Sequence, residues 1–285
     1  METVLLGASS LIYVLLSCIM LFLSKLLFDK FAPFSSNVQV KEGNCTPIIS
    51  FAGYIIGIVF ILIGAFVGPS CASLKEDLIM YLAYSILGIA LMGLSGVIVN
   101  KIILSKFNNT KEMLKDRNIG TAAVHFGFYL ASGLIIATCV NGEYGGLLST
   151  LLYYFLGMIF MFLFLKIYDK YTPYSIHEEL EKDNYSVGIA LAGNIIAIGL
   201  ILAKATLGDI ADVKESLIMY FVDLAAILLL LPGVRFVLGN VIVKSINLNE
   251  EIQKNNVSAG LMEFISIISF ALIVFFMVDF DKFII

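Results

Sequence analysis

The fold of this chain is decided by stretches such as residues 5–24, which read LLGASSLIYVLLSCIMLFLS and carry no charged side chain. A transmembrane helix needs about 20 mainly apolar residues to cross the hydrocarbon core of a bilayer. Similar stretches recur along all 285 residues, of which 60% are hydrophobic and only 14% are charged. Because soluble domains carry about 25% charged residues, this composition excludes a soluble enzyme, a disordered chain and a disulfide-rich secreted scaffold.

The apolar stretches predict an all-α integral membrane protein with eight transmembrane helices. The backbone must be helical in these stretches because lipid offers no hydrogen-bond partner for free N–H and C=O groups. The first span is expected to remain uncleaved, since it is longer than the apolar region of a signal peptide and has no basic start. The predicted spans are residues 5–28, 47–68, 78–104, 119–140, 147–167, 186–207, 216–243 and 257–279.

The basic residues are distributed unevenly between the two sets of loops. Thirteen of the 18 Lys and Arg residues lie in the last turn of the first, third, fifth and seventh spans or in the loops that follow them, and three lie on the opposite side. The remaining two, Lys204 and Arg235, lie inside the sixth and seventh spans and are assigned to neither side. Because cytoplasmic loops carry the excess of basic residues, we expect an inner-membrane protein with both termini outside the cytoplasm.

The two halves of the chain repeat each other. Residues 28–34, FDKFAPF, align with residues 168–174, YDKYTPY, at a spacing of 140 residues. At the same spacing, residues 53–56, GYII, align with residues 193–196, GNII. We therefore predict two tandem four-helix membrane units, residues 1–142 and 143–285. Since four is an even number, both units have the same orientation, and an axis along the membrane normal relates them in a parallel topology.

The order and spacing of these motifs resemble a bacterial inner-membrane family, the YjfL-like domain of unknown function 350. Family members typically consist of one such unit, so this chain is similar to a tandem fusion. The resemblance implies an inner-membrane protein, often suggested to belong to envelope-stress systems, and it supplies no catalytic residues. The matching residues are Asp29, Lys30, Pro33, Asn44, Thr46 and Gly53 in the first copy, and Asp169, Lys170, Pro173, Asn184, Ser186 and Gly193 in the second.

Four asparagines precede the even-numbered spans, and we predict that they cap these helices. A short polar side chain at this position accepts a hydrogen bond from one of the first free N–H groups of the helix. The four residues are Asn44, Asn118, Asn184 and Asn256.

The motifs Asp29-Lys30-x-x-Pro33 and Asp169-Lys170-x-x-Pro173 follow the first span of each unit. Proline ends a helix because it lacks an N–H group and restricts the residue before it. We interpret the two motifs as interfacial anchors. The alternative is that they form a turn that docks the loop or a partner.

Small residues recur in the second span of each unit, at Gly53 and Gly57 and again at Gly193 and Ala197. Small residues four positions apart allow another helix to approach closely. This pattern predicts tight helix packing, either between the two units or within each of them.

Apart from the lysines in the last turns of the odd-numbered spans and the aspartate that ends the eighth span, five ionisable residues lie within the predicted spans and form a candidate polar site. An isolated charge at bilayer depth costs about 2.5–3.5 kcal/mol or more, so such residues face protein or water and find partners. His125 and Glu263 occupy equivalent positions in the two copies, and we expect Glu263 to pair with Arg235. We interpret the five as structural pairs, and the alternative is a transport path. They are His125, Lys204, Asp223, Arg235 and Glu263.

The sequence contains no metal-ligand cluster, phosphate-binding loop or nucleophile motif. We therefore expect no enzymatic activity, no cofactor and no nucleic-acid partner. The leading hypothesis is a structural or partner-binding component of the membrane, which contacts the lipid bilayer and either another copy of itself or a cytoplasmic protein. The alternative is a small transporter or channel that uses the polar residues of the second unit. His177, in a loop, is expected to be solvated.

Overall fold

The computed structural model describes residues 2–104, 108–141, 146–207 and 246–277, and in addition 214, 217–218, 220–222 and 224–225. Every regular element within these residues is helical. Seven of the helices are long and apolar enough to cross a membrane, which confirms an all-α membrane protein. They correspond to the first six predicted spans and the eighth. The seventh predicted span, 216–243, lies mostly outside the described residues.

Long helices alternate with short ones along the chain. The long helices are α1 (Glu2–Phe31), α3 (Cys45–Val67), α4 (Leu74–Ile98), α6 (Ile119–Val140), α7 (Gly146–Tyr171), α9 (Tyr185–Thr206) and α12 (Val257–Met277). The short α-helices are α2 (Ser36–Lys41), α5 (Asn109–Lys111), α8 (Ile176–Glu181) and α11 (Leu248–Gln253). Two π-helical turns, η1 (Val99–Ile103) and η2 (Glu112–Asp116), complete the described elements.

The structure repeats where the sequence repeats. The order α1, α2, α3 in the first copy returns as α7, α8, α9 in the second, and α2 and α8 lie 140 residues apart. The last helix of each copy, α6 or α12, packs against the helix that corresponds to α3.

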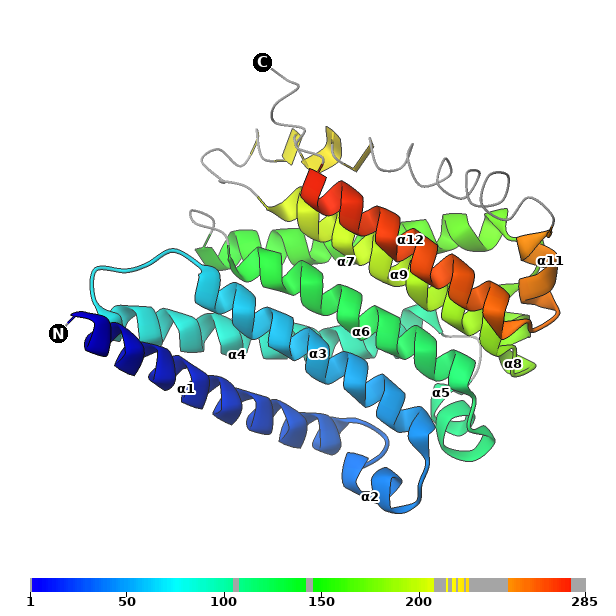
Figure 1. Ribbon diagram of the computed structural model, residues 1–285, viewed down its shortest axis with the longest axis horizontal. Coiled ribbons are helices and arrows are strands. Elements are labelled where there is room, and N and C mark those ends of the chain that lie inside the picture. Colours follow the sequence, from blue (N-terminus) through cyan, green and yellow to red (C-terminus); the bar gives the residue numbers. More distant parts are fainter. Residues whose placement is uncertain are drawn as a thin grey trace.

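Four helices form one continuous row, in the order α3, α6, α9 and α12 (Figure 1). Within this row, α6 packs against α3 of its own copy on one side and against α9 of the second copy on the other. Helices α4 and α7 lie behind the row in Figure 1 and cover one of its faces. The boundary between the two copies therefore runs through the middle of the row, between α6 and α9, and we call this boundary between the copies the seam.

Small residues let the backbones of the row touch. A Cβ atom at Gly53 would lie 2.6 Å from the Cα of Phe126, and one at Gly193 would lie 2.6 Å from the Cα of Phe264. The small-residue pattern thus serves the packing within each copy, which decides between the two expected roles. Other small residues close the seam, where a Cβ at Gly199 would lie 2.6 Å from the Cα of Ala131.

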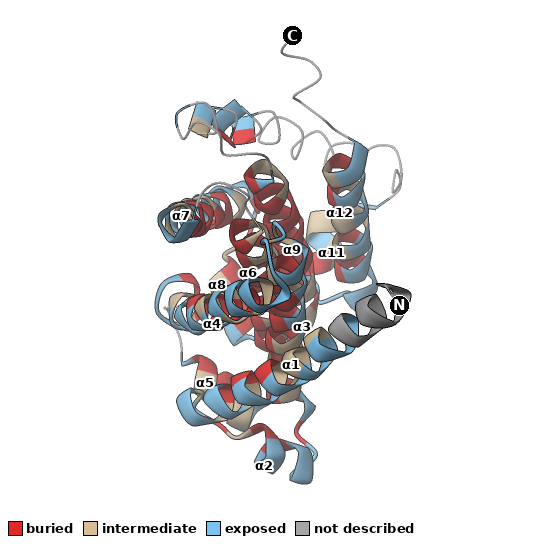
Figure 2. Ribbon diagram, turned by 90° about the vertical axis from the view of Figure 1, so that its left-hand side faces the viewer, coloured by how far each residue is buried: buried red, intermediate tan, exposed pale blue. Residues whose placement is uncertain are grey.

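Burial falls from the middle of the row toward its ends. The most apolar stretches of α9 and α6, in the middle, are 94% and 67% buried, whereas those of α3 and α12, at the ends, are 44% and 28% buried. Figure 2 shows this contrast, with buried residues concentrated on α6 and α9. Exposed apolar side chains on the outer helices suit a protein whose surroundings are lipid rather than water.

Two predicted span ends are wrong by a few residues. Helices α1 and α7 continue to Phe31 and Tyr171, so the Asp-Lys pairs lie inside their last turns rather than after them. The two prolines, Pro33 and Pro173, stand just beyond the helix ends. The helices stop there because the residue before a proline is disfavoured in the helical conformation.

Candidate functional site

Asparagine side chains begin the helices of the row at the end of the bundle where the short helices lie, which we call the short-helix end. Asn44 Oδ1 accepts from the Thr46 amide at 3.3 Å, Asn118 Oδ1 from the Thr121 amide at 2.9 Å, and Asn184 Oδ1 from the Val187 amide at 3.1 Å. Asn256 Oδ1 accepts from the Ser258 amide at 3.2 Å. Each bond satisfies an N–H group that has no partner within its own helix.

The amide nitrogens of the first three asparagines connect neighbouring segments into a series that we call the asparagine ladder. Asn44 Nδ2 donates to Met113 O at 3.2 Å, in η2, and Asn118 Nδ2 donates to Leu180 O at 2.6 Å, in α8. Asn184 Nδ2 donates to Ile252 O at 3.1 Å, in α11. Each acceptor lies in the short helix that precedes the next asparagine. The ladder therefore crosses the seam at its middle rung, from Asn118 to Leu180.

Each asparagine is also oriented by a side chain five or six residues before it. The four acceptors are Gln39, Glu112, Glu179 and Glu251, at distances of 3.0–3.1 Å from Nδ2. The last of these interactions is solvent-exposed. Hydrogen bonds from Asn256 and from Lys254 hold the pKa of Glu251 below its ordinary value, because both donors favour the charged carboxylate.

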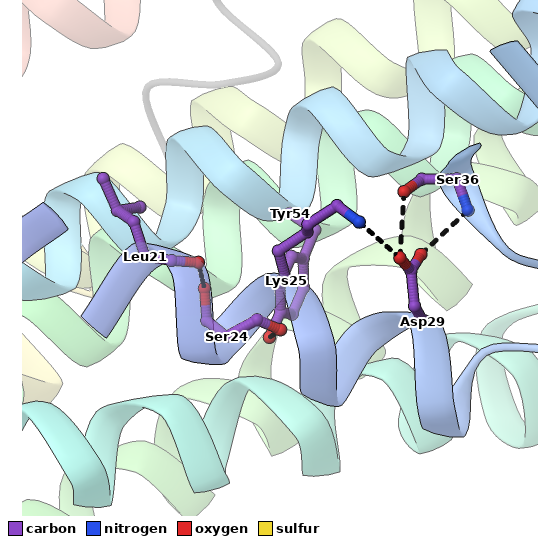
Figure 3. Close-up of polar contacts among 6 residues, drawn as sticks. All are labelled: Leu21, Ser24, Lys25, Asp29, Ser36 and Tyr54. Atoms are coloured by element: carbon purple, nitrogen blue, oxygen red, sulfur yellow. Dashed lines mark hydrogen bonds and ion pairs between the residues drawn. The ribbon is translucent and has the colours of Figure 1, made fainter. Parts of the chain in front are cut away.

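In both copies, the aspartate of the Asp-Lys motif caps the short helix that follows. Asp29 accepts from the Ser36 amide at 2.8 Å and from the Ser36 hydroxyl at 3.2 Å, and it pairs with Lys25 at 2.7 Å (Figure 3). In the second copy, Asp169 accepts from the Ile176 amide at 3.3 Å. The aspartate thus joins the last turn of a long helix to the first residue of α2 or α8. Lys30, next to Asp29, lies 5.8 Å from the ring centroid of Phe31.

A second polar contact crosses the seam at the short-helix end. The Nε2 atom of His177, in α8, lies 3.1 Å from Ile103 O, in η1. The expectation that His177 is a solvated loop residue is therefore wrong. No sequence pattern predicts this contact, because the partner of His177 is a backbone carbonyl 74 residues away.

Glu263 is the centre of a buried polar cluster in the second copy. Its side chain is 2% exposed, and its Oε1 accepts from Tyr168 Oη at 2.9 Å and from Asn194 Nδ2 at 2.9 Å. The three residues come from α7, α9 and α12, so the cluster joins three helices. Sequence reasoning nominated Glu263 but missed Tyr168 and Asn194. Asn194 alone was detectable, as an isolated amide in an apolar span.

The equivalent junction of the first copy has a different chemistry. Phe28, Tyr54 and His125 occupy the positions of Tyr168, Asn194 and Glu263. The ring centroids of Phe28 and Tyr54 lie 4.7 Å apart, and Tyr54 Oη donates to Ser24 O at 3.2 Å. His125 is 1% exposed, and within the described part of the chain its Nε2 has no hydrogen-bond partner.

The structure does not gather the predicted intramembrane residues that it describes into one site. His125 and Glu263 lie on helices that α9 separates (Figure 1). Lys204 lies in the last turn of α9, at the opposite end from the ladder. Asp223 and Arg235 lie outside the described residues, and so does the expected pairing of Arg235 with Glu263. Among the described residues, no group of three or more His, Cys, Asp and Glu side chains is arranged to hold a metal ion.

Comparison with known proteins agrees with the repeat. The family model described as Domain of Unknown Function (DUF350) matches residues 2–140 and again residues 143–278. The chain is 23% identical over 222 residues to a protein named UPF0719 transmembrane protein from Aquifex aeolicus (strain VF5), covering 75% of this chain and 78% of that protein. No solved structure matches the chain.

Proposed function

This chain belongs to the DUF350 family as two tandem copies, and on that premise we propose that it is a non-enzymatic structural or partner-binding component of the bacterial inner membrane. In this proposal the chain crosses the membrane eight times, as parallel units at residues 1–142 and 143–285. The short-helix end faces the cytoplasm and both termini lie outside, in agreement with the distribution of basic residues. The envelope-stress role implied by the resemblance is part of the proposal.

The observation that carries this proposal is the tightness of the seam. Transporters built from repeats alternate their access by rocking one repeat against the other. Here a Cβ at Gly188 would overlap the backbone of Gly120, and one at Gly127 would lie 2.8 Å from Ala192 O. The rung from Asn118 to Leu180 ties the same seam at the short-helix end. Rocking would have to separate these backbone contacts, so the seam favours a rigid scaffold.

Reconstitution into liposomes tests the proposal. We expect the purified protein to produce no flux of protons, sodium or potassium ions above that of empty liposomes. Flux that depends on the protein would contradict a purely structural role. Gly188→Leu, whose side chain would push the two copies apart at the seam, serves as the control for folding. If this variant does not fold, its elution in detergent shows it, independently of any flux measurement.

The proposed orientation is tested by labelling single cysteines in a cysteine-free background. Val38 is 46% exposed in α2, and Ser70 is exposed in the segment between α3 and α4. In intact cells we expect a membrane-impermeant maleimide to label Ser70→Cys and to label Val38→Cys only after permeabilisation. The reverse pattern would overturn the orientation.

A small transporter or channel is the second candidate, and the Glu263 cluster is the observation that favours it. Ionisable side chains inside membrane spans mark ion or proton pathways in many transporters. If this role is correct, flux appears in the liposome experiment and Glu263→Gln abolishes it while the protein still elutes as a folded species. Flux that survives Glu263→Gln would exclude this cluster as the site.

A further inference from the structure

The asparagine ladder has two open ends. Asn44, Asn118 and Asn184 are at most 3% exposed, and each donates to the backbone of the following short helix. Asn256, the fourth capping asparagine, is exposed, and within the described residues its Nδ2 donates only to Glu251. One N–H of its amide group is therefore directed to no acceptor in the described part of the chain.

The matching acceptor lies at the other end of the row. Leu180, whose carbonyl accepts a hydrogen bond from Asn118, corresponds to Val40 in the first copy. Leu180 O accepts from both the Asp183 amide and Asn118 Nδ2. Val40 O accepts from the Gly43 amide and, among the described residues, from no side chain. The side chains differ in the same way, because Leu180 is 0% exposed whereas Val40 is 65% exposed.

We propose that a second copy of this chain docks here, with Asn256 of one copy donating to Val40 O of the next. The contact continues the seam, which is an interface that already exists between the two halves of the chain. In the seam, α6 of the first copy meets α8 and α9 of the second. Between chains, α12 would meet α2 and α3 of its neighbour. The inference goes beyond the proposed function and does not depend on it.

The outer faces of the row set how far this contact extends. Where the seam has Gly188, Gly199 and Gly127, the equivalent outer positions carry Ile48, Val59 and Ile265. Larger side chains keep helix backbones further apart. The contact between two chains is therefore concentrated at the short-helix end, where Val38 and Val40 are exposed. The outer parts of α3 of one chain and α12 of the other stand further apart than α6 and α9 do within a chain.

The donor and the acceptor are on different surfaces, so the contact is head-to-tail. Such a heterologous interface closes into a ring or continues as an open row, depending on the rotation between copies. In a two-fold dimer, by contrast, both chains would use the same surface patch.

Cysteine cross-linking tests the contact directly. In the seam, a Cβ at Gly120 would lie 3.3 Å from Leu180 Cδ2, and the equivalent positions between copies are Ser258 and Val40. In a cysteine-free background, oxidation of the double variant Val40→Cys/Ser258→Cys in membranes should give covalent dimers and higher multimers. A mixture of the two single variants should give dimers only. The matched control is Glu178→Cys/Ser258→Cys, whose first position is also exposed at the short-helix end, and it should stay monomeric.

A second variant separates the contact from folding. Asn256 is exposed, so Asn256→Ala should change the melting temperature of the protein no more than Asn108→Ala does, since Asn108 is another exposed cap. Loss of one hydrogen bond between chains should weaken the association of the chains by about fivefold. The oligomer fraction in lipid nanodiscs measures this association. The proposal is overturned if the wild type is monomeric in nanodiscs at all protein densities. It is also overturned if Val40→Cys cross-links to itself, or if Val40→Cys/Ser258→Cys gives no more multimer than its control.

Discussion

The two copies share one backbone arrangement but fill the same three-helix junction differently. In the second copy, Glu263 accepts hydrogen bonds from Tyr168 and Asn194. In the first copy, the equivalent positions hold His125, Phe28 and Tyr54; the rings of Phe28 and Tyr54 pack against each other, and that of His125 lies beside Tyr129. The close backbone contacts beside the junction are the same, since Gly53 and Gly193 both approach a phenylalanine Cα of the last helix.

This difference shows which parts of the unit are fixed by geometry. The close glycine contacts need residues without a side chain, because any additional atom would separate the backbones. The asparagine ladder needs side-chain amides, because a side chain without an amide group would lose the N–H donor. The junction only needs to be filled and its polar groups satisfied. A buried carboxylate requires hydrogen-bond donors around it, so Tyr168 and Asn194 occur where Glu263 occurs, and apolar rings are sufficient in the other copy.

The largest expected effect tests whether the two copies pack alike. We expect Gly53→Leu and Gly193→Leu each to lower the free energy of unfolding by about 3 kcal/mol, because the added side chain meets backbone that cannot move aside. Thermal unfolding in detergent, followed by circular dichroism, measures the loss. Gly93→Leu is the control, since no atom outside its own helix lies within 4 Å of a Cβ at Gly93. Clearly unequal losses for the two glycines would break the equivalence of the copies.

The next effect tests the difference between the junctions. Glu263→Leu removes the acceptor of Tyr168 and Asn194 and should cost about 1–3 kcal/mol, the penalty of leaving buried donors unsatisfied. Glu263→Gln keeps the shape and one acceptor, so it should cost less. His125→Phe should cost less than Glu263→Leu, because no hydrogen bond to Nε2 is lost within the described residues. Equal losses for His125→Phe and Glu263→Leu would mean that the histidine has the same structural weight as the glutamate.

A smaller effect compares equivalent rungs of the ladder. Asn44→Ala and Asn184→Ala should each cost about 2 kcal/mol, at the upper end of the range for helix caps, because each also loses donors to a neighbouring segment. Asn108→Ala should cost about 0.5 kcal/mol. The side chain of Asn108 also accepts a hydrogen bond, from the Lys111 amide, but Asn108 is exposed and belongs to no rung. Similar melting temperatures for Asn184→Ala and Asn108→Ala would argue against the ladder.

The smallest effect concerns the exposed end of the ladder. Because the pKa of Glu251 is lowered in the folded protein below its ordinary value of 4.5, the charged carboxylate stabilises the fold above that pH. The stabilisation is lost as the pH falls through the lowered pKa. Glu251→Gln should therefore reduce the pH dependence of unfolding below about pH 4.5. The measurement is a series of melting curves across this range, and identical pH profiles for wild type and variant would contradict the prediction.

The membrane class, the helical fold, the repeat and the positions of the capping asparagines could all be predicted from the amino-acid sequence. These features depend on local properties: the length of an apolar stretch, the spacing of a motif, and the chemistry of the residue that begins a helix. The orientation of the chain was also predicted from the sequence, and it stays a prediction until the labelling experiment is done.

Which helices lie side by side and which polar groups meet could not be predicted in this way, because both depend on how the whole chain packs. The row α3, α6, α9, α12, the rung from Asn118 to Leu180 and the contact of His177 with Ile103 all join segments far apart in the chain. Their acceptors are backbone carbonyls, which every residue carries and no sequence pattern identifies. The small residues predict close packing, but the helices that they contact depend on how the two copies lie against each other. Packing in three dimensions, rather than any single motif, therefore made one continuous row from two similar halves.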